Sequence, residues 1–420
     1  MASTLDTGHT AERERSNWLS VEQPRLGMIG MVVLLSAANA ICPFAIDMYT
    51  PAVPSMPAYF STSQEMINLT LLGFYLFFSM GMLVFGPICD RTGRKPILVG
   101  GMAVFTAGSL LCAVSGSIEA LIVFRLVQAI GAGAVCAVST AIIKDCFVPE
   151  RRTQLLSVLQ VLMVLGPVLA PLAGGFLLRF FLWRANFAAL ALVGAVCTVM
   201  TLLFAESLPV DERVRGKLSV SFRRMEKVAA NPSFMSLLVF MSLFSIPFMA
   251  YVAAASYVYV NGFHTTEQVY SYFFAATAAV SACGPFVYWF AGRHMTDRAF
   301  IHMVVVVGLI VAAALLLCAE ASIWVFFICF ALFVMLEASI RPSITNVLLS
   351  LQDKDAGSAS SLINFVSNIL GVVGMGLITL FAADYVWGLG LIMVASMGAA
   401  ALLWAWICRS DRPDIPTLGK

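Results

Sequence analysis

Long apolar runs separated by short polar stretches dominate the sequence. Twelve such runs can be delimited, and each is near or above the about 20 residues that an α-helix needs to cross a bilayer. A helix satisfies its own backbone hydrogen bonds in lipid, so the pattern predicts transmembrane helices. We place them at residues 26–50, 65–89, 97–115, 119–146, 152–178, 185–205, 233–260, 267–291, 300–318, 322–350, 357–382 and 386–408.

The longest polar interruption, from Ser207 to Pro232, divides these helices into two groups of six. We therefore expect an all-α membrane protein of twelve transmembrane helices in two pseudo-symmetric six-helix bundles. The interruption carries six basic residues and is expected to be a solvated linker. We expect a mobile cytoplasmic tail at residues 1–25 and a first bundle at 26–206. A cytoplasmic linker at 207–232 then leads to a second bundle at 233–408 and a cytoplasmic C-terminal tail at 409–420.

The composition supports this class. Of 420 residues 60% are hydrophobic and 11% charged, and the mean hydropathy is +0.91, which lies outside the range of soluble globular proteins. The net charge is +2 and the basic residues lie between apolar runs, so no nucleic-acid partner is expected. The ten cysteines show neither CxxC nor Cys/His ligand spacing, so we expect neither a disulfide framework nor a metal site.

The distribution of basic residues predicts the orientation. If the N-terminus is cytoplasmic, 21 of the 25 Lys and Arg residues fall in cytoplasmic segments, all except Arg125, Arg179, Arg184 and Arg341. Cytoplasmic loops of membrane proteins carry an excess of Lys and Arg. We therefore expect a multi-pass protein of the cytoplasmic (inner) membrane with both termini in the cytoplasm.

Asp47 is the only ionisable acid or base between Gly27 and Phe60. It lies near the end of the first apolar run, before Pro51, Pro54 and Pro57. A carboxylate at membrane depth costs roughly 2.5–3.5 kcal/mol and usually faces a polar cavity or a partner. Asp47 is therefore a candidate proton carrier of a transporter. The alternative is a helix-end Asp that caps the following segment.

The turn after the second expected helix concentrates glycine and charge. It reads GPICDRTGRKP at residues 86–96. Gly86 would permit close helix contact, and Gly93 a left-handed turn. We expect Asp90, Arg91 and Arg94 to form a charge network with neighbouring helix ends. This network would hold the two six-helix bundles together when the cytoplasmic side is closed. Candidate partners are Asp145 and, for Asp90, the positive N-terminus of the eleventh helix near Gly357 and Ser358.

This turn resembles the G-x-L-x-D-R-x-G-R-K signature of the major facilitator superfamily, with Ile88 in place of Leu. Twelve spans and a central loop match as well, so the resemblance covers essentially the whole chain. It implies a transporter and no enzyme. The counterpart in the second half, at 292–298, is degenerate. The residues that the resemblance assigns to the cytoplasmic gate are Gly86, Asp90, Arg91, Gly93 and Arg94.

Arg125 opens the run RLVQAIGAG in the fourth expected helix. A buried Arg needs a partner, and Asp47 is expected at a similar depth, so we expect the two side chains to approach. The run is similar to the family motif R-x-x-Q-G-x-G, with Ala129 in place of one Gly. The resemblance implies proton coupling by Asp47 and Arg125, in which protonation of Asp47 weakens their pairing and favours one facing.

The fifth expected helix carries small residues at a spacing of four together with two prolines. A kinked packing helix explains this pattern by itself. The run is also similar to the antiporter motif of drug exporters in the superfamily, with Ala170 in place of one Gly, and this favours export over uptake. The motif residues are Gly166, Pro167, Pro171, Gly174 and Gly175.

Three further stretches resemble the Bcr/CflA branch of drug:proton antiporters. They begin at Asp47, Trp183 and Ser256 and read DMY, WRANF and SYVY. Related exporters carry a second acid two turns before this Asp, where the present chain has Asn39. Candidate cavity residues, which could equally be packing residues, are Asn39, Tyr49, Phe248, Tyr251, Tyr257, Asn364 and Phe365.

Glu337 and Arg341 in the tenth expected helix are spaced i,i+4 and are expected to form an internal ion pair. We interpret the pair as structural, and a contact to substrate is the alternative.

Together these features predict proton-coupled multidrug efflux, and hence antibiotic resistance, by alternating access. The expected partners are a lipophilic small-molecule substrate, protons and the lipid bilayer; no cofactor is expected beyond the proton gradient, and the protein is expected to be a monomer. The first alternative is an uptake symporter or uniporter of the same fold. A membrane-embedded enzyme or receptor is disfavoured, because the sequence has no HExxH and no plausible Ser/His/Asp set.

Overall fold

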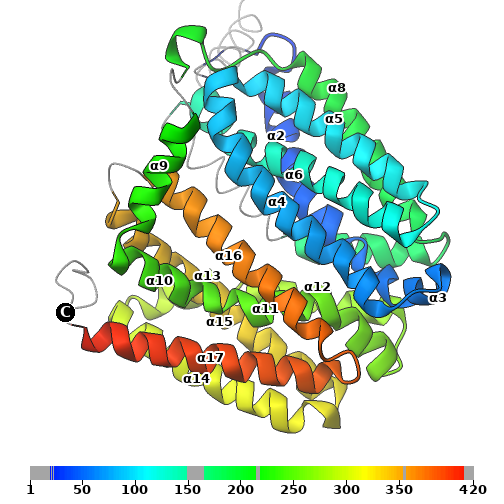
Figure 1. Ribbon diagram of the computed structural model, residues 1–420, viewed down its shortest axis with the longest axis vertical. Helices are drawn as coiled ribbons and strands as arrows, with labels where there is room; N and C mark the ends of the chain where they lie inside the picture. The colour runs from blue at the N-terminus through cyan, green and yellow to red at the C-terminus, as the bar shows by residue number, and fades with distance from the viewer. Residues whose placement is uncertain are drawn as a thin grey trace, which may run out of the picture.

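The computed structural model describes residues 19, 21, 23–148, 165–213, 218–352 and 356–410, and this part of the chain is almost entirely helical (Figure 1). The only strand-like pairing among these residues is one bridge between Leu19 and Phe147. The helical elements, with η for short 3₁₀ or π turns, are α2 (Gly27–Asp47), η1 (Thr50–Ser55), α3 (Met56–Phe60), α4 (Gln64–Thr92), α5 (Arg94–Ala113), α6 (Ile118–Cys146), the helix Leu165–Leu178, α8 (Arg184–Leu203), η2 (Val210–Glu212), α9 (Leu218–Ala229), α10 (Pro232–Leu243), α11 (Ser245–Tyr257), η3 (Val258–Gly262), α12 (Glu267–Ser281), α13 (Gly284–Ala291), α14 (Asp297–Cys318), η4 (Ala319–Ala321), α15 (Ile323–Ser350), α16 (Ala356–Thr379) and α17 (Tyr385–Arg409).

The predicted membrane segments are present. Within the described ranges, 11 helical segments are long and apolar enough to cross a membrane, judged by length and composition. They coincide with eleven of the expected runs, and the shorter apolar helix Leu165–Leu178 lies at the place of the fifth. Residues 152–164 of that fifth run lie outside the described residues. The all-α fold class is therefore confirmed.

The first membrane segment is longer than the sequence analysis predicts. Helical structure does not stop near residue 50 but continues through η1 and α3 to Phe60, where Ser61 takes a φ of +51° and ends it. Pro51 and Pro57 lie in the first turns of η1 and α3, where the missing N–H of proline has no helical partner to lose. Asp47 consequently lies inside the segment Gly27–Phe60 and not at its end.

The chain forms two helical bundles, one from α2 to α8 and one from α10 to α17. In the first bundle α6 packs against α2, α4 and α5, and in the second α15 packs against α12, α13 and α14. In Figure 1 the two bundles come together at the end where α3 lies and spread apart toward the end where α9 lies. We call these the α3 end and the α9 end. The bundles touch mainly where α16 meets α4 and where α11 and α12 meet η1.

Glycines allow the helices of the first bundle to approach closely. A Cβ atom on Gly131 of α6 would lie 2.4 Å from the backbone nitrogen of Phe105 in α5, and one on Gly133 would lie 2.4 Å from the carbonyl oxygen of Phe78 in α4. Helices in membranes associate through such small-residue contacts, because lipid provides no hydrophobic driving force between them. The glycines after Arg125 therefore fix α6 between α4 and α5.

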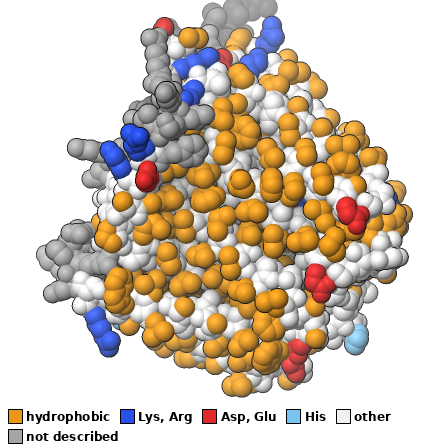
Figure 2. Space-filling view, in the orientation of Figure 1, with side chains coloured by type: hydrophobic (Ala, Val, Ile, Leu, Met, Phe, Trp, Pro, Cys, Tyr) orange, Lys and Arg blue, Asp and Glu red, His pale blue; other side chains and the backbone are white. Residues whose placement is uncertain are grey.

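The surface carries a broad apolar band. Figure 2 shows hydrophobic side chains across most of the visible face, with Lys and Arg along the edge toward the α9 end and acidic side chains near both ends. Large apolar side chains such as Leu192, Ile310 and Leu402 are more than half exposed. Such exposure suits contact with acyl chains, and it would be unusual for a soluble monomer.

Two segments expected to be solvated are partly packed. Gln23, at the end of the expected mobile tail, is buried, and it exchanges hydrogen bonds with the backbone of Ala205 at 3.1 and 2.8 Å. The expected linker contains the amphipathic helix α9, which contacts α4, α10 and α16. Val228 of α9 is buried. These corrections have one cause, since both segments cover apolar helix ends that would otherwise face water.

Candidate functional site

Asp47 ends α2 and is buried, with 6% of its surface exposed. Its carboxylate makes no hydrogen bond or ion pair with any residue that the structure describes, so the capping alternative finds no support here. A buried carboxylate without a partner is costly in its charged form, which makes Asp47 the least compensated acid in the described membrane segments.

The expected ion pair between Asp47 and Arg125 is absent. Arg125 is fully buried, and its Nη1 donates hydrogen bonds to the carbonyl oxygen of Ala45 and to Oε1 of Gln128, both at 2.8 Å. Gln128 in turn donates to Ser109 of α5 at 2.8 Å. The prediction of a direct pair is therefore wrong for this conformation. Arg125 contacts the backbone two residues before Asp47 instead of the carboxylate.

Arg125 is stabilised by a helix end and by aromatic rings. The last carbonyl groups of a helix lack intrahelical partners and form the negative end of its dipole, and Ala45 belongs to the last turn of α2. The guanidinium also lies over the rings of Phe74, Tyr49 and Phe187, at 4.3, 5.2 and 5.6 Å from their centroids. Cation–π contacts of this kind replace part of the stabilisation that a carboxylate would give.

Side chains from two other elements complete the end of α2. Asn186 of α8 donates to the carbonyl oxygen of Met48 at 3.0 Å, and Thr50 donates to the carbonyl oxygen of Asp47 at 2.8 Å. Together with Arg125 they satisfy carbonyl groups at or next to the C-terminus of α2, which would otherwise be unpaired in the membrane. Asp47 is thus held at a fixed place although its own carboxylate has no partner.

The glycines of the helix Leu165–Leu178 face this region. A Cβ on Gly174 would lie 1.9 Å from the carbonyl oxygen of Met48, and one on Gly166 would lie 2.7 Å from Pro43. A Cβ on Gly175 would lie 2.5 Å from the hydroxyl of Ser271 in α12. The predicted close packing at Gly166, Gly174 and Gly175 is therefore present. The run that contains Pro167 and Pro171 packs against α2 beside Asp47 and against the second bundle.

Two hydrogen bonds between described residues join the bundles, and both lie toward the α3 end. Tyr270 of α12 donates to Thr50 at 3.0 Å, and Tyr385 at the start of α17 donates to Gln64 at the start of α4 at 3.0 Å. Thr50 also contacts the backbone of Asp47. The α3 end is therefore closed in this conformation, and its closure is linked to the end of α2.

The predicted cavity residues fall into two groups. Tyr49, Tyr251 and Tyr257 are buried, and so is Asn39, which donates to the carbonyl oxygen of Leu35 at 2.8 Å. Tyr251 stacks on Phe330 with centroids 4.2 Å apart. Contact of these four with a substrate would need a different conformation. The others, which are partly or fully exposed, are Phe248, Asn364 and Phe365.

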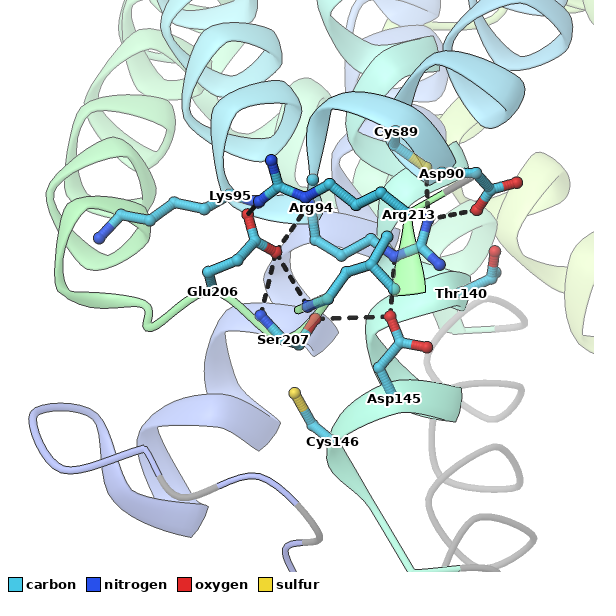
Figure 3. A network of polar contacts seen from close by, with 12 residues as sticks. Cys89, Asp90, Arg94, Lys95, Thr140, Asp145, Cys146, Glu206, Ser207 and Arg213 are labelled. Atoms are coloured by element: carbon cyan, nitrogen blue, oxygen red, sulfur yellow. Dashed lines mark hydrogen bonds and ion pairs between the residues drawn. The ribbon is translucent and has the colours of Figure 1, made fainter. Parts of the chain in front are cut away.

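At the α9 end, Arg94 is the centre of the charge network (Figure 3). Its Nε pairs with Asp145 of α6 at 2.7 Å, and its Nη1 pairs with Asp90 and contacts Cys89 Sγ at 3.0 Å. The prediction that Asp145 is a partner of this network is confirmed. All these residues belong to the first bundle, so the network holds α4, α5 and α6 together and does not cross to the second bundle.

Glu206 completes the network from the end of α8. Its carboxylate accepts hydrogen bonds from the backbone N–H groups of Arg94 and Lys95 at 2.8 and 3.2 Å, and it pairs with Arg213 at 3.7 Å. Glu206 thus caps the N-terminus of α5, where an acid is favoured. Gly93 has a φ of +104° and ψ of 165°, and a Cβ there would lie 2.3 Å from Glu206. Gly93 is therefore required twice, for its backbone conformation and for the approach of Glu206.

The other gate residues are more open. The Asp90 side chain is 48% exposed, and no ion pair or hydrogen bond between described residues joins it to the start of α16. Nε and Nη2 of Arg91 are buried without a hydrogen-bond partner in the described chain. A Cβ on Gly86 would meet no atom within 4 Å, so the expected close contact at Gly86 is wrong here. The reason is that no neighbouring helix packs against this position of α4 in this conformation.

Glu337 and Arg341 form the predicted ion pair, with 2.6 Å between Oε1 and Nε. Arg341 Nη2 also reaches Ser245 Oγ of α11 at 3.4 Å. The described residues contain no group of three or more His, Cys, Asp or Glu side chains that could hold a metal ion.

Sequence reasoning assigned no role to Gln128, Asn186 or Glu206. Each is a polar residue within or beside an apolar run. Gln128 and Glu206 accept hydrogen bonds from a side chain or backbone of another residue, and Asn186 donates to a helix end. A polar residue in or beside a membrane segment was the available signal, because its hydrogen-bonding groups must be satisfied by protein.

Comparisons with known proteins agree with this architecture. Residues 35–375 match the family model described as Major Facilitator Superfamily. The chain is 26% identical over 351 residues to an uncharacterized MFS-type transporter, YdgK, of Bacillus subtilis, covering 82% of this chain and 86% of the relative. It is 24% identical to the bicyclomycin resistance protein homolog of Haemophilus influenzae, covering 84% and 89%. A chloramphenicol resistance protein of Pseudomonas aeruginosa is 35% identical over 170 residues, 40% of each chain.

Solved structures share the fold. A bacterial homolog of the human lysosomal transporter Spinster, in an inward-facing and occupied conformation, superposes with a TM-score of 0.73 at 18% identity, covering 94% of this chain and 99% of that one. The xylose transporter XylE of E. coli, in an inward open conformation, gives a TM-score of 0.69 at 12% identity, covering 93% and 98%. At such identities the likeness shows the fold alone.

Proposed function

Because the chain belongs to the Major Facilitator Superfamily, we propose that it exports lipophilic small molecules, including drugs, across the cytoplasmic membrane in exchange for protons. Two of the relatives described above are named for resistance to bicyclomycin and chloramphenicol, which supports drugs as the substrate class and export as the direction. The glycine-rich helix Leu165–Leu178 beside α2 supports the same direction by its likeness to the antiporter motif. The protein acts as a monomer and needs no cofactor besides the proton gradient.

The observation that carries proton coupling is the buried Asp47 carboxylate, which has no partner among the described residues. A charge at this place is costly, because no described cation pairs with it. Asp47 therefore takes up a proton when the α3 end is open, carries it while that end closes, and releases it toward the α9 end when substrate binding favours the deprotonated form. Thr50 connects closure of the α3 end with the proton site, because it contacts both the backbone of Asp47 and Tyr270 of the second bundle.

Arg125 takes a different part from the one that the sequence suggests. It fixes the end of α2 through Ala45 and lies in an aromatic cage. Arg125 therefore positions the end of α2 next to Asp47 without pairing with the carboxylate. Alternating access follows from rocking of the bundles about their contact, and the α9 end, where the bundles spread apart, is then the cytoplasmic side.

Transport in proteoliposomes tests the proposal. We expect an imposed pH gradient to drive chloramphenicol or another lipophilic drug through the wild-type protein, and Asp47→Asn to abolish this coupling. Glu320→Gln is the matched control, because Glu320 is an exposed acid in η4. Full pH-driven transport by the Asp47→Asn variant would remove Asp47 from its role, and accumulation in right-side-out vesicles would replace export by uptake.

Thiol labelling tests the orientation. In a background without the native cysteines, a cysteine at Ser61 should react with an impermeant reagent added outside cells, and a cysteine at Thr92 should not. The reverse pattern would place both termini outside.

A further inference from the structure

The ion pair in α15 is unequally buried. The Glu337 side chain is 7% exposed, whereas that of Arg341 is 42% exposed. Glu337 binds Arg341 through Nε, which leaves hydrogen atoms of Nη1 and Nη2 for other acceptors. Nη2 makes one long contact to Ser245, and Nη1 has no partner among the described residues. The pair therefore leaves donor groups available, which an ion pair with only a structural role would not need.

Arg341 lies well inside the membrane-crossing part of α15. It is nine residues from the end of the helix at Ser350, which corresponds to about 14 Å along the axis. A guanidinium facing acyl chains at this depth would be costly. Its contact Ser245 begins α11, and α11 also touches α4 and η1 of the first bundle. The exposed edge of Arg341 therefore lies on the side of α15 that faces α11, the helix through which the second bundle contacts the first.

Both apolar and polar side chains lie near Arg341 along α11 and α15. Phe248 lies one turn after Ser245 on the same side of α11 and is partly exposed. Thr345, one turn after Arg341, uses its hydroxyl on the sulfur of Met241 at 3.9 Å. Apolar walls with a small number of placed polar groups are typical of small-molecule sites. Arg341 is the polar group that such a site would offer here.

We propose that Arg341, held by Glu337 and Ser245, is the subsite that binds a hydrogen-bond-accepting oxygen of the transported molecule. This inference rests on the proposed function and specifies its substrate class. Glu337 balances the charge of Arg341, so the subsite favours uncharged molecules that carry a carbonyl, nitro, sulfonyl or phosphoryl oxygen on an apolar body. Lipophilic cations are disfavoured, because they meet the guanidinium and not the buried carboxylate.

Three triaryl compounds of similar size provide matched probes. Triphenylphosphine oxide is uncharged and has one strong acceptor oxygen, methyltriphenylphosphonium is a cation without an acceptor, and triphenylacetate is an anion. Binding to the purified full-length protein in lipid nanodiscs is measured directly with each radiolabelled probe. We expect the wild-type protein to bind the phosphine oxide most tightly and the phosphonium most weakly.

The central variant is the double substitution Glu337→Gln with Arg341→Gln, which removes both charges together and leaves no unpaired buried charge. It should weaken phosphine oxide binding about tenfold, the scale of a lost hydrogen bond to a charged group, and it should reduce discrimination against the phosphonium. Glu337→Gln alone should instead tighten triphenylacetate binding. Arg298→Gln, at an exposed position in the first turn of α14, is the control and should change none of these affinities.

Two results would overturn the subsite. One is an unchanged ratio of affinities in the double variant, and the other is no phosphine oxide binding by wild-type protein that still transports another compound. Failure of the proposed function is distinct, since it would appear as no pH-driven transport of any compound by protein that binds the phosphine oxide as expected.

Discussion

Tyr270 of α12 donates a hydrogen bond to Thr50 at 3.0 Å, and Thr50 donates to the carbonyl oxygen of Asp47 at 2.8 Å. A side chain of the second bundle is thereby connected to the end of the helix that carries the uncompensated acid. Closure at the α3 end and the environment of Asp47 are therefore linked through Thr50.

Removal of this contact should open the α3 end. Tyr270→Phe deletes one hydrogen bond worth about 1 kcal/mol, which corresponds to about a fivefold shift in a two-state equilibrium. A cysteine at the buried position Ala52 of η1 should then react about five times faster with a thiol reagent from the outer side. Tyr272→Phe is the control, because Tyr272 lies on the same helix and is exposed. Equal rates in the two variants would show that Tyr270 does not control closure.

Because Asp47 and Arg125 do not form an ion pair, substitutions at the two positions should affect thermal stability differently. Breaking a buried ion pair typically costs 3–5 kcal/mol, but Asp47 has no such pair here, so Asp47→Asn should leave the melting temperature in detergent unchanged or higher. Arg125→Gln should lower it clearly, because the bonds to Ala45 and Gln128 are lost. In a double-mutant cycle the coupling energy between the two positions should stay below about 0.5 kcal/mol. A coupling of several kcal/mol would restore the direct pair.

Alanine substitutions at two glycines of the gate turn, Gly93 and Gly86, should have very different effects on stability. Gly93→Ala forces a side chain into a backbone region that favours glycine and against Glu206, and it should cost about 2 kcal/mol or more of stability. Gly86→Ala adds a methyl group where no atom lies within 4 Å, so it should be tolerated in this conformation. Thermal unfolding of the purified variants measures both, and similar losses would contradict the assignment of Glu206 as the cap of α5.

The charge of Asp90 should shift the equilibrium between the conformation in which the α9 end is open and the one in which it is closed. If Asp90 contacts the N-terminus of α16 only when the α9 end is closed, Asp90→Asn should cost that state about 1 kcal/mol, or about fivefold. A cysteine at the exposed Asn364 of α16 should react faster, a cysteine at Ala52 more slowly, and transport should fall. Unchanged reactivities with lost transport would mean that Asp90 acts through folding or insertion.

Much of the fold was predictable because the membrane imposes it. Backbone groups in lipid must be satisfied within helices, so apolar run length located the segments. The ion pair Glu337–Arg341 and the pairing of Arg94 with Asp145 were predictable for a related reason. Opposite charges at helical spacing or at neighbouring helix ends have few other charged partners within reach. The length of the first segment was not predictable, because prolines in the first turn of a helix and prolines that end a helix look alike in sequence.

The environment of Arg125 shows what the sequence could not supply. One of its two acceptors is the carbonyl oxygen of Ala45, and every residue has such a group, so nothing in the residue types identifies it. The cap of Glu206 on α5 joins positions 112 residues apart and depends on the conformation of Gly93. Where charged side chains bind backbone groups, pairing rules based on opposite charges fail.

The hydrogen bonds that join the bundles at the α3 end, Tyr270 with Thr50 and Tyr385 with Gln64, involve only uncharged side chains. The α9 end instead carries charged side chains, of which Asp90 is half exposed and pairs with Arg94. Salt screens exposed charges, with a Debye length of about 10 Å at 0.1 M, and it hardly affects neutral hydrogen bonds. Ionic strength therefore acts on the two ends of the molecule unequally, and high salt should weaken the charged contacts at the α9 end more than the hydrogen bonds that close the α3 end.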